Sequence, residues 1–552
     1  MKNWKIREQV SPDLEKQLLS AKKIQEEDKN IFFEPPYENL YNPFDILDMD
    51  KAVDRILRAI KESEKIILFG DYDADGVCGT AIFFSFFEKI GFENFDTYIP
   101  DRHKEGYGLN EKVIDEFIEN KVDLIITIDC GITDFEEIKK LKENNIDTII
   151  TDHHLNTGEL PPALAIVDSK QKKDKYPFDM LCGAAVAFKV VQALINKGQF
   201  NIVPGWEKWL LDLVAIATVA DMVPLIDENR TLTYYGLKVL QKTSRVGLLS
   251  FFKNAKLRQG FITEDDIAFT IAPRVNIASR MEHANTSYSL LTTKSKEEAD
   301  WICKQLDSLN KDRRIVVEEI LEEINKRLEG QKDVSVVVEG GEHWNKGVLG
   351  LTSYRILEKH NCPVFLWAGG DGEEIKGSCR SDGSVSLVEL MEKIPEGILI
   401  EFGGHAFAAG FSICEGKTGE FKKEITKAFL KMDKKEVEDD LLIDKEARLE
   451  EINWSFLETI EKFAPFGMGN DRPVFLFKDV EVFGSKMFGN GEIHLQMDFK
   501  VENRVLQSIG FFMNNGFDVK KGDKIDLVAS VERSTFKGFD ELRLRIVDFH
   551  VK

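Results

Sequence analysis

Acidic residues and histidines follow four short apolar runs in the first half of this chain. They are Asp71, Asp73 and Asp75 after residues 65–69, Asp129 after 124–128, Asp152, His153 and His154 after 148–151, and Asp221 after 214–220. Short apolar runs of this kind are typical of buried parallel strands, and the carboxyl ends of parallel strands meet at one edge of an α/β sheet. Carboxylates crowded at that edge would repel one another without cations between them. The pattern therefore predicts a cluster of two metal ions.

The mixture of carboxylates and imidazoles indicates which metals and which chemistry to expect. Such ligands suit Mn²⁺ or Mg²⁺ better than a structural zinc ion. Two such ions about 3.5–4 Å apart can activate a water and neutralise the oxygens of a phosphoryl group. A calcium EF-hand loop would begin in the same way at Asp71, but its twelfth position requires glutamate and is Ile82 here. A Rossmann fingerprint is absent, and residues 414–418 match only part of a P-loop.

Composition restricts the class of protein. The formal net charge of −22 argues against a wide basic surface for duplex binding, but it leaves room for a local basic groove. No apolar run reaches the about 18 residues of a membrane span, and the first nine residues lack the apolar core of a signal peptide. The seven cysteines include no CxxC pair, so we expect neither a disulfide framework nor a cysteine zinc site. These features favour a protein of the reducing cytoplasm, without a membrane partner.

The apolar periodicity changes along the chain and divides it into segments. They are an irregular arm (1–50), an α/β catalytic domain (51–240), a connecting helical region (241–330), a second, smaller α/β domain (331–432) and, after a charged linker, a β domain (441–552). In the helical region, apolar residues between 294 and 328 recur mostly at intervals of three, four or seven. This spacing predicts one helix on the order of 50 Å long, which would bridge two domains.

The C-terminal segment has the two-residue periodicity of strands. Segments 474–477, 492–499 and 541–546 alternate in this way, and Asn490-Gly491 is a strong hairpin-turn signal. These patterns predict a small all-β barrel of the OB type, with most of its phenylalanines inside. One or two exposed rings could stack on bases. The phenylalanines of this segment include Phe477, Phe483, Phe488, Phe511 and Phe512.

Several of these segments resemble a known family. Residues 71–76 (DYDADG) with 152–154 (DHH) resemble the DHH phosphoesterase superfamily. Residues 100–109, 218–225 and 272–276 resemble the RecJ family of single-strand-specific 5′→3′ DNA exonucleases. Residues 344–350 with Gly404-His405 are similar to that family's DHHA1 domain. The resemblance covers most of the chain from about residue 50 onward and implies an α/β protein with a doubly wound DHH domain, a DHHA1 domain and a C-terminal OB-fold.

The resemblance also implies roles for individual residues. The metal ligands would be Asp73, Asp75, Asp129, His153 and Asp221, with Asp129 bridging two ions; Asp71 and His154 would lie beside them. The catalytic residues would be Asp129, His153 and His154. A 5′-phosphate and nucleic-acid site would comprise Arg102, Arg274, Arg280, Ser378, Arg380 and His405.

Each assignment has a structural alternative. Asp71 could cap the turn after its strand, Arg102 could be an ordinary surface arginine, Arg274 could brace a domain interface, and His405 could be a structural histidine. Three positions also depart from the family's pattern. Ser279 and Cys379 stand where glycine is common, and Asp168 stands where asparagine is usual.

The function expected from these features is metal-dependent hydrolysis of single-stranded DNA from its 5′ end, in DNA repair and recombination. A single-strand-binding protein and a helicase are expected partners, and we expect a monomer. One alternative is a DHH phosphodiesterase that acts on short oligoribonucleotides or cyclic dinucleotides, against which the barrel and the long helix argue. Another is a non-catalytic replication scaffold of the same fold, which would have no need to keep so many carboxylates together.

Overall fold

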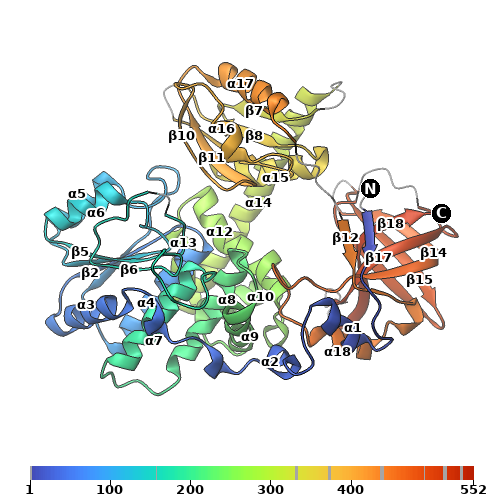
Figure 1. The fold of residues 1–552 in the computed structure, drawn as a ribbon, viewed down its shortest axis with the longest axis horizontal. Helices are drawn as coiled ribbons and strands as arrows, with labels where there is room; N and C mark the ends of the chain where they lie inside the picture. Colours follow the sequence, from blue (N-terminus) through green and yellow to red (C-terminus); the bar gives the residue numbers. More distant parts are fainter. Residues whose placement is uncertain are drawn as a thin grey trace. The chain divides into compact units, whose positions relative to one another are not determined.

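The computed structural model describes residues 3–156, 158–329, 334–370, 374–434, 440–489, 492–513, 519–534 and 539–552 (Figure 1). The chain forms two compact units. The larger unit comprises Tyr41–Asp221 and Gly236–Val437, and the barrel unit comprises Met1–Leu40, Met222–Tyr235 and Glu438–Lys552.

A five-stranded parallel sheet forms the first half of the larger unit. Its strand order is β3 (Phe95–Tyr98), β2 (Ile66–Gly70), β4 (Leu124–Ile128), β5 (Asp147–Thr151) and β6 (Ala165–Val167). β2 and β4 are buried along their whole length, as expected for strands covered by helices on both faces. The strand order reverses at β2, which pairs with both β3 and β4. This is the switch point at which open α/β sheets bind ligands.

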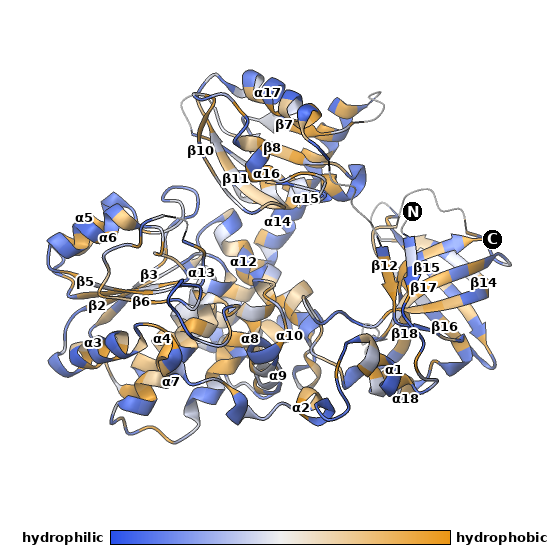
Figure 2. Ribbon diagram, viewed as in Figure 1, coloured by the Kyte–Doolittle hydropathy of each residue, from blue (hydrophilic) through white to orange (hydrophobic). Residues whose placement is uncertain are grey.

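Helices cover both faces of this sheet (Figure 1). One face carries α3 (Met49–Glu62), α4 (Ala74–Ile90) and α7 (Gly183–Lys197), and the other carries α5 (Glu111–Glu119) and α6 (Phe135–Glu143). The outer helices α5 and α6 are mainly hydrophilic in Figure 2, and their few buried residues, such as Phe117 and Leu141, pack on Phe69 and Ile125 of the strands. The doubly wound α/β domain is therefore confirmed.

One expected strand is wrong. Residues 214–220 belong to helix α8 (Leu211–Ala220), so Asp221 lies at the end of a helix rather than of a strand. Nearly every residue of α8 is buried, so its apolar residues show no helical periodicity. A short apolar run of this kind cannot be assigned to strand or helix by periodicity alone.

The helical region contains the predicted long helix. α14 (Lys296–Leu328) has 33 residues, about 50 Å at 1.5 Å per residue, and Ser295 caps it by accepting a hydrogen bond from the Glu298 N–H. Its first half packs on neighbouring helices, whereas Val317 and Ile324 belong to the core of the second α/β domain. The other helices are α9 (Asp227–Leu240), α10 (Val246–Asn254), α11 (Glu264–Asp266), the π-helix η5 (Ile267–Ile271), α12 (Ala272–Met281) and α13 (Asn285–Thr292).

The second α/β domain of the larger unit has a mixed sheet. Its order is β10 (Leu399–Gly404), β11 (Ala408–Ile413), β9 (Ile375–Arg380), β8 (Val364–Ala368) and β7 (Val337–Gly341), and only β7 and β8 run parallel. The helices are α15 (Leu349–His360), α16 (Leu387–Met391) and α17 (Thr418–Lys431). β7 begins three residues after the start of the apolar run at Val334.

The C-terminal strands pair in a ring. The order is β14 (Phe475–Phe488), β15 (His494–Val501), β16 (Arg504–Gly510), β18 (Glu541–Val551) and β17 (Lys524–Ser534), and β17 pairs with β14 again. Short β13 (Lys445–Glu446) joins β14 in parallel, and α18 (Trp454–Glu461) lies beside this sheet. Phe477 is fully buried, as predicted for most rings. The expected turn at 490–491 lies outside the described residues, but the two strands on either side of it are antiparallel.

The segment before residue 41 is more regular than its sequence indicated. β1 (Asn3–Ile6) pairs in parallel with β12 (Asp440–Ile443), and α1 (Leu14–Ala21) packs on α18; α2 (Lys29–Phe33) follows. The Trp4 ring stacks on His550 with 4.0 Å between centroids. A four-residue strand is too short to show periodicity, and its partner is far away in the sequence. Among the described helices, none is both long and apolar enough to cross a membrane.

Candidate metal centre and anion site

The acids after β2 are held by the start of α4. The Asp71 N–H donates to Ile128 O at 3.1 Å, which ties this turn to β4. Asp73 is the N-cap of α4, and its Oδ1 accepts from the N–H groups of Asp75 and Gly76 at 2.8 and 3.2 Å. Asp75 lies in the first turn of α4 and is buried. Its two oxygens accept from the N–H groups of Gly183 and Ala184, the first residues of α7, at 2.6 and 2.7 Å.

Asp129, at the end of β4, lies at the centre of the cluster. Its φ of 63° is in the left-handed region, and its side chain lies against Gly183. A Cβ at Gly183 would be 2.6 Å from Asp129 Oδ1, so only glycine fits there. Asp129 Oδ1 is 3.1 Å from His153 Nε2. His153 Nε2 is also 3.7 Å from Asp75 Oδ2 and 3.8 Å from Asp221 Oδ2, so four predicted ligands converge on one point.

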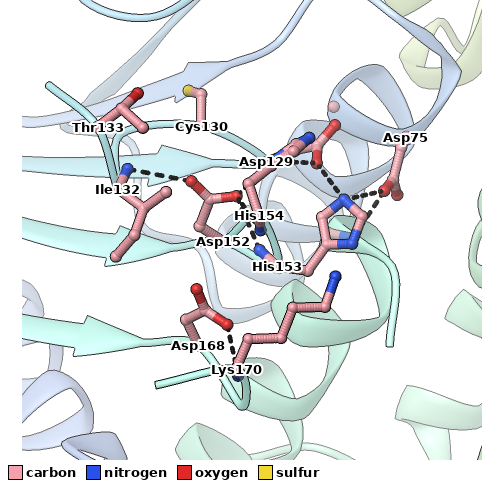
Figure 3. A network of polar contacts seen from close by, with 12 residues as sticks. Asp75, Asp129, Cys130, Ile132, Thr133, Asp152, His153, His154, Asp168 and Lys170 are labelled. Atoms are coloured by element: carbon pink, nitrogen blue, oxygen red, sulfur yellow. Dashed lines mark hydrogen bonds and ion pairs between the residues drawn. The ribbon is translucent and has the colours of Figure 1, made fainter. Parts of the chain in front are cut away.

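Asp152 orients both histidines that follow β5 (Figure 3). Its Oδ1 accepts from the backbone N–H groups of His153 and His154 at 2.7 and 3.2 Å, and lies 2.8 Å from His154 Nδ1. Its Oδ2 accepts from the Ile132 N–H at 3.1 Å. Asp152 is fully buried and was not among the predicted site residues. Its position before two histidines, at the end of a strand, was the available signal.

Burial and mutual repulsion shift the ionisation of the cluster. Burial, followed by repulsion from Asp73, raises the pKa of Asp75 to about 6. Burial and repulsion from Asp75 raise the pKa of Asp221 to about 8, and the same two causes place the pKa of Asp129 well above its ordinary value. These carboxylates are charged at neutral pH only at a considerable energetic cost, which a nearby cation would remove.

The two histidines differ in charge. Burial, with repulsion from His154, lowers the pKa of His153 to about 3, so its ring is neutral and can ligate a metal. Burial is the largest single influence on His154 and lowers its pKa, but the hydrogen bond to Asp152 and the charges of Asp152, Asp221 and Asp75 together outweigh burial and raise that pKa to about 9. At neutral pH His154 is therefore protonated.

The residues present fit divalent cations. Three groups each offer ligand atoms within 4.8 Å of one another. They are Asp71, Asp73 and Asp129; Asp75, His153 and Asp221; and Asp129, His153 and His154. Within the described part of the chain, no hydrogen-bond donor meets the buried Oδ1 atoms of Asp71 and Asp129. Such atoms are costly unless a cation or donor meets them. The structure thus brings together all predicted ligands, and Asp129 and His153 each belong to two groups.

Two further residues support the cluster and were not predicted. The Tyr107 hydroxyl donates to Asp129 O at 3.0 Å and lies 3.2 Å from His154 Nδ1. Asn276 Oδ1 accepts from the Ala74 N–H at 2.7 Å and so holds the first residue of α4. Both lie in segments that carried the family resemblance, but neither has a residue type that by itself indicates a metal site.

Four predicted phosphate-site residues gather beside this cluster. The Arg102 guanidinium lies 4.8 Å from the centre of the Tyr72 ring, and Arg380 Nη1 is 3.2 Å from Ser378 Oγ. Burial, with repulsion from Arg102, Arg313 and Arg380, lowers the pKa of Arg280 to about 9. Arginines that repel one another in a buried place favour an anion between them. We call Arg102, Arg280, Ser378 and Arg380 the arginine group.

The remaining two predicted residues lie differently. Arg274 Nε donates to Asp307 Oδ1 at 3.1 Å and its Nη1 to Thr270 O at 3.1 Å, so it braces α12 against α14, as its structural alternative suggested. His405 is exposed in the turn between β10 and β11, and its N–H donates to Ala408 O at 2.8 Å.

The sequence matches three family models. They are the N-terminal domain of the DHH family at residues 65–218, the DHHA1 domain at 333–431 and the RecJ OB domain at 443–548. The single-stranded-DNA-specific exonuclease RecJ of Haemophilus influenzae is 30% identical over 534 residues, covering 93% of this chain and 92% of that protein. The enzyme of the same name from Bacillus subtilis is 34% identical over 95% of this chain, which spans 66% of its length.

Solved structures with the same fold contain metals. RecJ of Thermus thermophilus in complex with Mn²⁺ matches 99% of this chain and 79% of its own, with a TM-score of 0.80 and 26% identity. A RecJ exonuclease bound to manganese matches 72% of this chain and 97% of its own, with a TM-score of 0.62 and 32% identity. The Thermus enzyme has also been solved with Mg²⁺.

Proposed function

The chain belongs to the RecJ family of single-stranded-DNA-specific exonucleases, and on this premise we propose that it hydrolyses single-stranded DNA from the 5′ end at a centre of two divalent metal ions. The observation that carries the proposal is the convergence of Asp75, Asp129 and Asp221 on His153 Nε2, beside the arginine group. An acidic cluster that needs cations adjoins a basic group that needs an anion, which suits a metal-bound phosphodiester with a terminal phosphate.

The proposed ligands are Asp73, Asp75, Asp129, His153 and Asp221, with Asp129 shared between two ions. When bound, the ions lower the pKa of a water molecule and offset the charge of the phosphoryl oxygens. The backbone N–H groups at the start of α7 hold Asp75, and Asp152 holds the tautomer and the orientation of the histidines. The ligands are therefore positioned before metal or substrate binds.

The reaction adds a water oxygen to the scissile phosphorus and breaks its bond to the 3′ oxygen of the terminal nucleotide. The water loses a proton, and the 3′ oxygen gains one and leaves as a hydroxyl, so the shortened strand keeps a 5′-phosphate. His154 holds a proton at neutral pH, and its half-exposed ring can reach a leaving group. Its Nδ1 faces Asp152, which leaves the Nε2–H as the proton donor.

The arginine group would set the polarity. A terminal phosphate carries more charge than an internal diester and offers oxygens to several guanidinium forks at once. Arg102 and Arg280 come from the DHH domain and the helical region, whereas Ser378 and Arg380 come from β9 of the second α/β domain. The expected site residues Arg274 and His405 would act less directly, through α14 and through the β10–β11 turn.

The barrel would hold the strand by stacking. Phe483, Phe511 and Phe512 are partly exposed, by 43%, 39% and 59%. Lys521 lies 5.0 Å from the centre of the Phe483 ring and Arg545 lies 5.4 Å from that of Phe511, so cations accompany two of these rings. Exposed aromatic rings next to cations are the usual surface for single-stranded nucleic acid.

We further propose a monomer that acts in the reducing cytoplasm, where its seven free cysteines stay reduced, in repair and recombination beside a single-strand-binding protein and a helicase. The test is digestion of 5′-labelled and 3′-labelled single strands, of duplex and of a dinucleotide, each with Mn²⁺ and with Mg²⁺. Release of mononucleotides from the 5′ end of long single strands is expected. Faster cleavage of the dinucleotide would favour the small-substrate phosphodiesterase, and no cleavage in either metal would favour the scaffold.

A further inference from the structure

A lysine that the sequence did not indicate lies beside the metal-compatible cluster. Lys170 follows the edge strand β6, and Figure 3 shows its side chain extending from the turn after β6 toward His153. Its ammonium group interacts electrostatically with His153, Asp168 and Asp221. Two of these three residues are predicted metal ligands, so this positive charge belongs to the site.

The backbone after β6 fixes the position of Lys170. β6 pairs in parallel with β5, which ends immediately before Asp152. Asp168 Oδ1 accepts from the Lys170 N–H at 2.8 Å, and Gln171 Nε2 donates to Ile166 O at 2.7 Å. Asp168, the residue that replaces the family's usual asparagine, is only 1% exposed. This turn is therefore packed into the fold by a buried side chain. Asp168 is thus a positioning residue for Lys170.

The cations around the cluster divide into two sets. Arg102 and Arg280 of the arginine group interact with Tyr72, and Arg280 also with Asp73. Lys170 instead interacts with His153 and Asp221. If the arginines bind the terminal phosphate, the next phosphate, the one that is cut, would lie at the metal ligands His153 and Asp221, beside which Lys170 is a cation.

We propose that Lys170 contacts the scissile phosphodiester and donates a hydrogen bond from Nζ to one of its oxygens. This inference rests on the proposed exonuclease function and assigns one more residue to it. Negative charge grows on the phosphoryl and 3′ oxygens while the water oxygen bonds to phosphorus and the P–O3′ bond breaks. A donor fixed at that place beforehand lowers the barrier, because it need not reorganise during the reaction.

The experiment compares Lys170→Met, Lys170→Arg and Lys172→Met. Lys172 is an exposed lysine of the same loop and serves as the matched control. On 5′-phosphorylated oligothymidylate in saturating Mn²⁺, Lys170→Met should lower kcat by about 10²-fold, the loss typical of one such donor, with KM changed less than about threefold. Lys170→Arg should recover part of the rate because it keeps a charged donor, and Lys172→Met should match the wild type.

Calorimetric titration with Mn²⁺ distinguishes a contact between Lys170 and the phosphodiester from an effect of the Lys170 charge on metal affinity. The inference requires that Lys170→Met binds Mn²⁺ about as tightly as the wild type. A rate loss that disappears at higher Mn²⁺, or a change in KM without a change in kcat, would overturn it. Asp168→Ala should lower kcat through Lys170, so the double variant Asp168→Ala/Lys170→Met should be no slower than Lys170→Met; additive losses would remove the positioning role of Asp168.

The same variants on bis(p-nitrophenyl) phosphate distinguish this inference from the proposed function. A wild type that cleaves this diester but not single-stranded DNA, with a loss in Lys170→Met, would refute the exonuclease and keep the lysine contact. A wild type that degrades DNA from the 5′ end, with no loss in Lys170→Met on either substrate, would keep the exonuclease and refute the contact.

Discussion

The metal-compatible cluster and the arginine group carry opposite charges but are built differently. The cluster is assembled by neighbouring strands, by the first turns of α4 and α7, whose N–H groups hold the carboxylates, and by the end of α8, which carries Asp221. The arginine group draws side chains from three separate parts of the larger unit. The carboxylates, which need cations, are thus brought together mainly at one edge of a single sheet. The arginines, which need an anion, are brought together by segments that are distant in the sequence. The first site should be preformed, and the second should depend on how those segments meet.

The largest expected effect tests the preformed site. Asp129→Ala removes the one carboxylate shared by two metal-compatible groups, so turnover should fall by at least 10²-fold, about 2.7 kcal/mol in the barrier. The fold should persist, because the lost group is repelled by Asp75 and Asp73. The measurement is kcat in saturating Mn²⁺ with a thermal melt of the metal-free protein. A variant that keeps more than about a tenth of the wild-type rate, a loss below about 1.4 kcal/mol, would exclude the shared role.

Metal removal should make stability depend on pH. The folded pKa values of Asp75 and Asp221, about 6 and about 8, lie above their unfolded values. Their favourable contribution to the free energy of unfolding is therefore complete below about pH 4. For each group it is lost as pH rises from about 4 to the folded pKa, at about 1.4 kcal/mol per pH unit, because over this range the unfolded chain releases a proton that the folded chain still holds. Melts from pH 4 to 9 in chelator and in Mn²⁺ should diverge as pH rises. Parallel curves would show that the carboxylates do not bind the metal.

Substitutions in the arginine group should reduce selectivity for the 5′ end rather than abolish activity. Arg380→Ala and Arg102→Ala should reduce the preference for a 5′-phosphate over a 5′-hydroxyl by about tenfold, about 1.4 kcal/mol, because each removes a fork from the terminal phosphate. The ratio of kcat/KM on the two strands measures this. Arg58→Ala, a surface arginine paired with Asp147, is the control. Arg274→Ala should change the ratio less than either, since Asp307 already engages its guanidinium; an unchanged ratio in Arg380→Ala and Arg102→Ala would assign end recognition elsewhere.

The smallest effect concerns the barrel. Phe512→Ala should raise KM about fivefold or more for long strands, within the range of about 1–3 kcal/mol for one stacked base. It should leave strands too short to reach the barrel unchanged, so a length series carries its own control. Deletion of residues 441–552 would be a poorer test, because β1 and α1 would lose their partners. Equal losses at every length would contradict stacking by Phe512.

The sequence was sufficient to predict site residues where residues with metal-binding side chains directly follow segments with the pattern of buried strands. Asp73, Asp75, Asp129 and His153 follow strands with an unmistakable pattern, so both the sheet and the convergence of these residues were predictable. Asp221 was found through its motif, although its strand proved to be α8, because a fully buried helix loses its amphipathic pattern. The long helix α14 was predictable because its apolar residues recur at helical spacing, and the buried ones, such as Ile302, Leu306 and Ile320, lie among them.

What escaped prediction depends on three-dimensional neighbours. Asp152 belonged to the pattern of acids after strands, but its hydrogen bonds to both histidines could not be inferred from that pattern. Lys170 lies in the turn after an adjacent strand, and nothing in its local sequence states which strands adjoin. Tyr107 and Asn276 contribute hydrogen bonds to backbone atoms, which no motif of residue types describes. Arg274 shares its residue type with the arginine group, but the carboxylate that engages it, Asp307, lies 33 residues away. The four proposed boundaries between the five segments likewise rest on changes of pattern.

The pairing of β1 with β12 has a consequence for biosynthesis. Asn3 leaves the ribosome early, yet its hydrogen-bond partner Asp440 lies 437 residues later. At about 5–20 residues per second, the first strand waits roughly 20–90 s for a partner. During that time the DHH and DHHA1 domains emerge complete and can fold, while Trp4 and the apolar face of α1 have no barrel to pack on. A ribosome-bound chaperone that covers residues 3–40 would meet its substrate in this interval, and its release would coincide with the end of translation.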